Sequence, residues 1–255
     1  MNTRIFVLFL LILFISPVIT YSSFERDSVA LRDTSLSNEI TYERKQVSYY
    51  IERIIYLPKK HYNKDDAMLM VKRIAAINPY LLEQMYKKHI RIKFFTGKLT
   101  DEPAFSHLKG VKPRGYSDEG PTWDDIPGAG GSTTVYVKVG HSNKGEGHGS
   151  VNLELHELGH TIDQQVLNGI RRNKEFLTHW QHERNKLFPN QSYFLLYPEE
   201  YFAEVFAMYY ANELTKKQLK SLAPHTLRYL EKILEVYPVH QEKHLFSFRL
   251  QNTAF

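Results

Sequence analysis

The chain of 255 residues contains no cysteine, so it holds neither a disulfide framework nor a lipid-modified cysteine. It also lacks a long membrane span, because the apolar run at residues 5–15 is shorter than the roughly 20 residues that cross a bilayer. Its lysines and arginines give a formal net charge of +5, but they are interleaved with acids and form no basic stripe. We therefore expect no nucleic-acid partner.

The first residues have the layout of a secretory signal, with a positive charge at Arg4, an apolar run and then Pro17. We expect a signal peptide at 1–21, a flexible leader at 22–45, one folded domain at 46–237 and a C-terminal tail at 238–255. The alternative is an uncleaved N-terminal anchor. On the first interpretation the protein is secreted and extracellular, with no stable membrane span once the signal is removed.

Apolar periodicity predicts helices separated by two short alternating stretches that are typical of strands. The fold is therefore expected to be α+β and helix-dominated, with a small β-sheet packed on the helix at 150–163. The long segment at 96–131 is rich in Gly and Pro, and a loop of that length is usually functional. The expected helices are 46–56, 65–75, a third from Asn78-Pro79, 150–163, one from Asn173 to Leu187, 198–210, 215–222 and 224–237; the expected strands are 90–95 and 133–139.

Residues 150–163 carry the motif H-E-x-x-H at His156, Glu157 and His160, with Ser150 as the expected N-cap. Two histidines four residues apart lie on one face of a helix and can bind one Zn²⁺ at about 2.0–2.1 Å each. Glu157 then lies beside the metal, where it can take a proton from a zinc-bound water. The alternative is a buried helix whose histidines only satisfy backbone carbonyls, and a third ligand decides between the two.

A catalytic zinc takes three protein ligands and keeps one open position. The spacing H-x-x-G-x-x-H is absent, so a carboxylate is the expected third ligand. Glu200 and Glu204 share one face of an apolar helix, where two acids need a positive partner. Either is a candidate ligand, with the other orienting a ligand histidine, whereas Glu199 is typical of a solvent-facing acid at a helix N-terminus. The acids considered are Asp163, Glu175, Glu183, Glu199, Glu200, Glu204 and Glu213.

Several longer motifs carry a family resemblance. The H-E-L-G-H motif at 156–160, followed by Y-F-L-L-Y-P-E-E-Y-F-A-E at 193–204, resembles the catalytic domain of anthrax lethal factor. The chain resembles the secreted bacterial Pro-Pro endopeptidases more closely, because that similarity also covers G-P-T-W-D-D-I-P-G at 120–128 and spans roughly 90–233. The resemblance implies a zincin-like metalloprotease domain that binds one Zn²⁺ per chain. The residues it assigns are the zinc ligands His156, His160 and Glu200, the general base Glu157, the catalytic Tyr193 and Glu204 behind the ligands.

These assignments predict a secreted zinc metalloendopeptidase that cuts between two prolines in extracellular or cell-surface proteins. One rival is a lethal-factor-like protease with another sequence specificity. The other is a non-catalytic cell-surface binding module with an incidental metal site, which has no need of Glu157 or Tyr193. From spacing alone, Tyr193 is equally an ordinary loop aromatic that rests on the core.

A substrate rich in proline is stiff and offers few N–H donors, so its protease must hold it by shape. Trp123 and the loop residues Gly130, Gly131, Ser132 and Thr133 are the expected substrate-binding residues. The alternative for Trp123 is a hydrophobic plug under the long loop. Pro121 stands where the resembled family commonly has a lysine, and this departure concerns the substrate subsites rather than the zinc chemistry.

Overall fold

A computed structural model describes residues 27–113 and 119–235. Its single described sheet has the strand order β1-β2-β3-β5-β4. The three central strands are parallel, and the edge strands β1 and β4 run antiparallel to their neighbours. The expected helix-dominated α+β fold with a small sheet is confirmed. The strands are β1 (Ser28–Ala30), β2 (Ile55–Pro58), β3 (Arg91–Phe95), β4 (Gly128–Ala129) and β5 (Thr134–Lys138).

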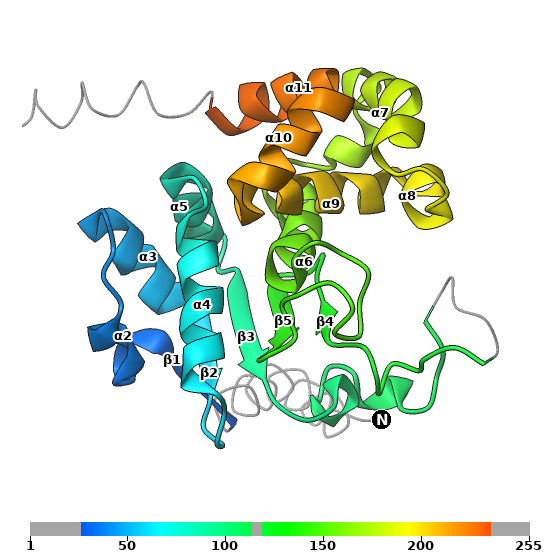
Figure 1. Ribbon diagram of the computed structural model, residues 1–255. Helices are drawn as coiled ribbons and strands as arrows, with labels where there is room; N and C mark the ends of the chain where they lie inside the picture. The colour runs from blue at the N-terminus through cyan, green and yellow to red at the C-terminus, as the bar shows by residue number, and fades with distance from the viewer. Residues whose placement is uncertain (1–26, 114–118, 236–255) are drawn as a thin grey trace, which may run out of the picture.

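The helices divide between the two ends of the molecule (Figure 1). Those before β3 lie together beside the sheet, whereas α7 to α11 gather at the other end, and α6 runs between β4 and β5 and the second group. Within the described ranges, no helix has both the length and the apolar character to cross a bilayer. The helices are α2 (Leu36–Glu39), α3 (Lys45–Ile54), α4 (Lys64–Ala75), α5 (Pro79–Lys87), α6 (Leu153–Thr161), α7 (Lys174–Leu187), α8 (Ser192–Leu196), α9 (Pro198–Ala211), α10 (Glu213–Leu222) and α11 (Pro224–Glu235).

Helix α6 carries the H-E-x-x-H motif, and its N-cap lies two residues later than expected. Its N-cap is Asn152, whose side-chain oxygen accepts a hydrogen bond from the backbone N–H of Leu155 at 3.0 Å. The expectation of Ser150 as the cap is wrong, because its hydroxyl instead contacts Nδ1 of His148 at 2.7 Å. Beyond Thr161 the helix widens into a π-helical turn, Ile162–Val166, a feature often found at functional sites.

Two expectations for the N-terminal part are corrected. Residues from Ser28 onward are not a flexible leader, because β1 pairs with β2 and the side chains of Leu31 and Leu36 are buried in the core. The helix expected to reach residue 56 ends at Ile54, and Ile55–Pro58 forms β2 against β3. A continuous apolar run fits a buried strand as well as a helix end, so periodicity alone did not separate them. The expected signal peptide and C-terminal tail lie outside the described residues.

Helices α6 and α9 cross at a glycine. A Cβ built on Gly159 would lie 2.8 Å from Cα of Ala203 and 3.0 Å from its carbonyl oxygen. The two backbones can therefore approach this closely only because neither residue at the crossing carries a large side chain. This contact sets the distance between the histidines of α6 and the acids of α9.

Gly159→Val is expected to destabilise the protein by about 1–3 kcal/mol, because the added side chain overpacks a crossing that has no room to yield. Zinc affinity should fall as well, since the crossing places Glu200 against the histidines. Urea unfolding and zinc titration measure the two effects. Gly149→Val is the matched control, because a Cβ there meets nothing within 4 Å. Equal stability of the two variants would contradict the role given to the crossing.

Candidate metal centre

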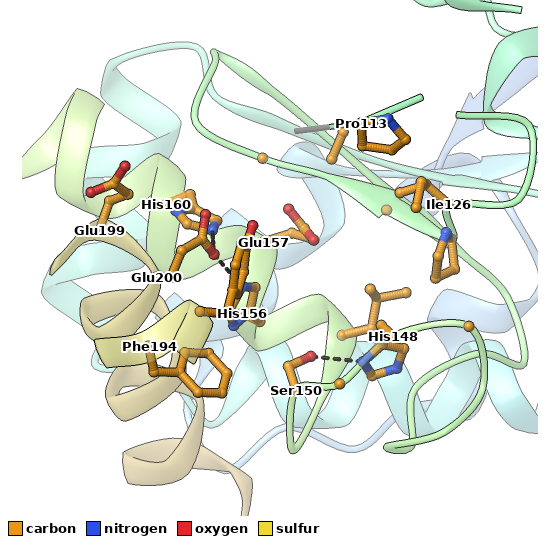
Figure 2. A pocket seen from close by; sticks show the side chains of 18 of the residues that line it. Pro113, Ile126, His148, Ser150, His156, Glu157, His160, Phe194, Glu199 and Glu200 are labelled. Carbon is orange, nitrogen blue, oxygen red and sulfur yellow. Dashed lines mark hydrogen bonds and ion pairs between the residues drawn. The ribbon is translucent and has the colours of Figure 1, made fainter. Parts of the chain in front are cut away.

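His156, His160 and Glu200 converge on one point, the metal point. Their ligand atoms all lie within 4.8 Å of one another, with the two histidines supplied by α6 and the glutamate by the first turn of α9. Oε2 of Glu200 lies 3.4 Å from Nε2 of His156 and 3.2 Å from Nε2 of His160. Figure 2 shows these side chains turned toward one another, with Glu199 standing apart. The structure therefore brings together the three residues expected as metal ligands.

The distances from Glu200 to the two histidine nitrogens, 3.4 Å and 3.2 Å, match a tetrahedral zinc site. Zinc lies about 2.0–2.1 Å from histidine nitrogen and about 2.0–2.2 Å from carboxylate oxygen, and a tetrahedron of that size has edges of about 3.3–3.5 Å. Burial raises the pKa of Glu200, but hydrogen bonds from both histidines hold it well below its usual range. The side chains thus stabilise positive charge at their centre, so this donor set fits a divalent cation.

Glu204 supports the cluster from behind. Its Oε2 lies 2.9 Å from Nδ1 of His156, and its Oε1 accepts the backbone N–H of Val151 at 2.8 Å. Glu204 is buried, with 2% of the residue exposed, and its hydrogen bond with Val151 fixes the orientation of the carboxylate. An Nδ1–H donated to Glu204 leaves the lone pair of Nε2 directed at the metal point. Glu204 therefore fixes the orientation of the His156 ring, and Glu200 alone of the pair faces both histidines.

Glu204→Gln is expected to lower zinc affinity by about 10–100-fold, because the amide is a weaker acceptor for His156 than the carboxylate. Competition with a fluorescent chelator measures the dissociation constant. The matched control is Glu175→Gln, which makes the same change at an exposed acid that pairs with Lys232. Unchanged zinc affinity in Glu204→Gln would contradict the orienting role.

Glu157 lies between the metal point and the chain segment after β4. A Cβ on Gly130 would overlap the backbone carbonyl of Glu157, and a Cβ on Gly128 would come within 3.0 Å of its Cγ. Burial raises the pKa of the Glu157 carboxyl, and a hydrogen bond from the backbone N–H of Gly130 opposes part of this shift. The glycines thus let an edge of the sheet lie directly over this carboxylate, whose raised pKa makes it a stronger proton acceptor than an exposed glutamate.

His148 also lines the site but is engaged elsewhere. Its Nε2 donates to the backbone carbonyl of His141 at 2.9 Å, so its Nδ1 accepts from the hydroxyl of Ser150 at 2.7 Å (Figure 2). Burial lowers the pKa of His148, which keeps the imidazole neutral. Both ring nitrogens are therefore occupied, and His148 is not a fourth metal ligand in this arrangement.

A cavity of about 810 Å³ opens over the metal point. Its wall includes Glu157, Tyr193 and Trp123, as well as the segment Gly128–Gly130 that the close contact with Glu157 already placed there. The Trp123 ring stacks on Phe105 with centroids 6.0 Å apart, so it packs against the small cluster under the loop and also borders the cavity. Tyr193 is 41% exposed and comes from α8, just before the helix that supplies Glu200.

The three other expected substrate residues are not among those that line the cavity. The backbone N–H of Gly131 donates to the hydroxyl of Thr161 at 2.9 Å, and that hydroxyl donates to the carbonyl of Ser132 at 3.2 Å. Ser132 and Thr133 are exposed on the far side of this turn. These bonds tie the residues after Gly130 to helix α6. They therefore help to hold Gly130 over Glu157, but they do not themselves form the cavity wall.

Sequence reasoning missed a polar stretch of the wall. Gln164, Arg171, Asn190 and Gln191 all line the cavity, and none was expected as a site residue. Asn190 has φ of +62°, a conformation that asparagine tolerates better than most residues, and this marks the sharp turn that enters α8. The available signal was the run of polar residues beyond the H-E-x-x-H helix, which carries no period and so predicts only a loop.

An H-E-x-x-H helix that meets a carboxylate from a later helix in one cavity defines a metal-binding domain of the zincin kind. The chain belongs to the family described as anthrax toxin lethal factor, N- and C-terminal domain, which matches residues 41–233. This confirms the family resemblance that the motifs suggested.

Two similar proteins and one similar solved structure are named Pro-Pro endopeptidases. The chain is 44% identical to a Pro-Pro endopeptidase of Clostridioides difficile (strain 630), over 72% of this chain and 82% of that protein. It is 37% identical to a Pro-Pro endopeptidase of Paenibacillus alvei, over 72% of this chain and 84% of the relative. The solved structure of the Pro-Pro endopeptidase from Paenibacillus alvei matches with a TM-score of 0.69, covering 72% of this chain and 99% of that one.

Proposed function

We propose that the protein is a zinc-dependent metalloendopeptidase that hydrolyses the peptide bond between two prolines. The observation that carries this proposal is the joint placement of His156, His160 and Glu200 around one point, with Glu157 beside it in the same cavity. The similarity to two Pro-Pro endopeptidases at 44% and 37% identity supplies the substrate class. The layout of residues 1–21 supports secretion, and with it extracellular or cell-surface substrates.

His156, His160 and Glu200 would hold the zinc ion. When bound, zinc supplies Lewis-acid chemistry, polarising the scissile carbonyl and lowering the pKa of a bound water. Glu157, whose pKa burial raises, takes the proton of the attacking water and later returns it to the leaving nitrogen. That return matters for this substrate, because a proline nitrogen must gain a proton before it leaves as a secondary amine. The chain's own task is therefore to hold the carbonyl, the water and Glu157 in line.

Tyr193 is proposed to donate its hydroxyl to the oxygen that becomes negative during attack. It lines the cavity and lies against Tyr197, with ring centroids 5.6 Å apart. Its 41% exposure fits a group that contacts substrate better than an aromatic resting on the core. An oxyanion donor contributes most where negative charge develops, so its effect belongs to the transition state.

Tyr193→Phe is expected to lower kcat by about 10²–10³-fold and to leave KM nearly unchanged, because the lost hydrogen bond forms only in the transition state. Steady-state kinetics on a proline-containing peptide separates the two constants. Tyr197→Phe is the matched control, since it removes a hydroxyl from the neighbouring ring. An equal loss in both variants, or a change confined to KM in Tyr193→Phe, would argue against the oxyanion role.

The cavity suits a stiff, extended peptide. Trp123 offers an aromatic face on its wall, and the glycines at 128 and 130 let the backbone of the β4 segment come close to Glu157. Consecutive prolines favour a polyproline conformation with no backbone N–H on the proline residues, so fit depends on ring faces and on donors for the carbonyls. Shape therefore selects proline on both sides of the cut bond.

A peptide library scored by mass spectrometry, with and without a chelator, tests the function. We expect cleavage that requires metal and is strongly enriched for proline on both sides of the bond. Metal-dependent cleavage without that enrichment would replace the specificity by that of a lethal-factor-like protease. No cleavage by the zinc-loaded protein would favour the binding module with an incidental metal site and refute the enzyme proposal.

A further inference from the structure

Arg171 is a permanently charged residue on the cavity wall that takes no part in the proposed zinc chemistry. Arg171 belongs to the 3₁₀ turn Ile170–Arg172, which follows the π-helical turn at the end of the metal helix. Its side chain is 26% exposed and lines the cavity, as do the polar residues Gln164 and Gln191. Arg171 is therefore held within the cleft wall rather than spread over the outer surface.

A buried carboxylate fixes the position of this arginine. Nε of Arg171 lies 3.3 Å from Oδ2 of Asp163, and the backbone N–H of Arg171 donates to Oδ1 of the same residue at 3.2 Å. The residue Asp163 is 1% exposed, and its backbone carbonyl accepts the N–H of Gly169 at 2.7 Å. The guanidinium is thus anchored at its Nε by an ion pair with a buried side chain, which also binds the backbone of Arg171.

The other edge of the guanidinium remains available. Arginine has five N–H donors, and only Nε is engaged, because the two Nη groups make no hydrogen bond or ion pair with residues 27–113 or 119–235. A planar pair of Nη donors matches the two oxygens of a carboxylate. Holding the arginine by Nε reduces the entropy that its long side chain would lose on binding.

The neighbouring cations lack this construction. Arg172 is exposed and does not line the cavity, and its guanidinium covers Gly169, where an added Cβ would lie 2.7 Å from its Nη2. Lys144 borders the cavity, but it is exposed on the loop before α6 and carries a single flexible ammonium group. Among the residues that the structure describes, Arg171 is the cavity-lining cation that combines an anchored Nε with a pair of uncommitted Nη groups.

We propose that Arg171, anchored by Asp163, binds a carboxylate of the peptide substrate and so determines specificity at one position beside the scissile bond. The carboxylate belongs either to an acidic side chain or to the C-terminus of a short peptide. This inference rests on the proposed peptidase function and adds a charged subsite to it. Asp163 offsets part of the arginine's charge, so the expected preference is moderate, about five- to tenfold.

The test compares matched peptides that contain one Pro-Pro bond. At each flanking position Glu is paired with Gln and Asp with Asn, and every peptide is made with a free and with an amidated C-terminus. For each pair the ratio of kcat/KM for acid over amide is measured with the zinc-loaded enzyme. Wild type should favour the acid about five- to tenfold at one position, or the free C-terminus, and Arg171→Gln should bring that ratio to about one.

Two further variants separate the subsite from folding. Arg172→Gln removes the adjacent exposed cation and should keep the wild-type ratio. Asp163→Asn with Arg171→Gln removes the buried charge together with its partner, so it gives the ratio even if Arg171→Gln alone unfolds. A ratio near one at every position in wild type, or a wild-type ratio that survives in the double variant, would overturn the proposal.

Failure of the proposed function gives a different result from failure of the subsite. If wild type cuts other bonds but not Pro-Pro, the same acid and amide pairs are placed around the bond that is cut, and the ratio is read there. If it cuts nothing, binding of the same peptides to the zinc-loaded protein is measured by fluorescence anisotropy. Equal affinity for acid and amide peptides in that assay would then reject the role of Arg171.

Discussion

Glu157→Gln should bind zinc as tightly as the wild type and lose hydrolysis by about 10³-fold or more in kcat. A general base contributes about 10²–10⁴-fold, and a glutamine in its place can neither take the proton of the water nor deliver one to the leaving proline nitrogen. The amide keeps the shape of the side chain and an oxygen for the N–H of Gly130, so the segment after β4 stays in place. Single-turnover kinetics and zinc content of the purified variant measure the two properties.

The expected loss must be separated from a loss of fold or metal. Zinc stoichiometry and the free energy of unfolding should match the wild type, because Glu157 is not among the three converging ligands. Substrate affinity should also be nearly unchanged, since the base acts in the transition state. Hydrolysis within about tenfold of wild type in a zinc-loaded Glu157→Gln protein would show that another group accepts the proton.

Glu200→Ala is expected to abolish stable zinc binding at micromolar protein and with it all but a trace of activity. It removes the one carboxylate oxygen that faces both histidines, at 3.4 Å and 3.2 Å, and leaves two imidazoles without their anionic partner. Two histidines alone do not complete the three-ligand set that a catalytic zinc requires. Isothermal titration with zinc and cleavage in buffered free zinc give the two readouts, and high free zinc should recover little activity.

Glu199→Ala provides the matched comparison, because it removes the neighbouring acid from the same helical turn. Glu199 lies apart from the histidine pair in Figure 2, so its loss should change zinc affinity by less than about threefold. The contrast isolates ligation from the general negative charge at the start of α9. If the two variants lose zinc to the same degree, Glu200 is not the third ligand.

Local spacing predicted the part of the site that lies within one helix. The i,i+4 relation of His156 and His160 fixes their common face whatever the tertiary structure, so the sequence alone places both imidazoles together. The cap was harder to choose, because Ser150 and Asn152 are both good N-cap residues and the competing contact with His148 decides between them. Asn173, in contrast, caps α7 as expected, with its side chain accepting the N–H of Phe176.

Long-range relations could not be read from periodicity. Glu200 follows His160 by forty positions, so its place opposite the histidines depends on the Gly159–Ala203 crossing. The apolar helix face offered Glu200 and Glu204 as equal candidates, and only the family resemblance chose Glu200 before the structure. The pairing of β1 with β2 likewise joins residues far apart in sequence. Periodicity could not show this pairing, so Ser28–Ala30 was expected to belong to a flexible leader. The contact of Asp163 with Arg171 had no signal in the sequence, because Asp163 lies in the π-helical turn Ile162–Val166, where the helical period breaks.

The metal centre itself is tested most directly by anomalous diffraction at the zinc absorption edge from crystals of the active protein. The account predicts one peak per chain, about 2.0–2.1 Å from Nε2 of His156 and of His160 and about 2.0–2.2 Å from a carboxylate oxygen of Glu200, with Glu157 beside it but not bound. A peak bound elsewhere, or an active crystal in which Glu200 points away from the two histidines, would contradict it.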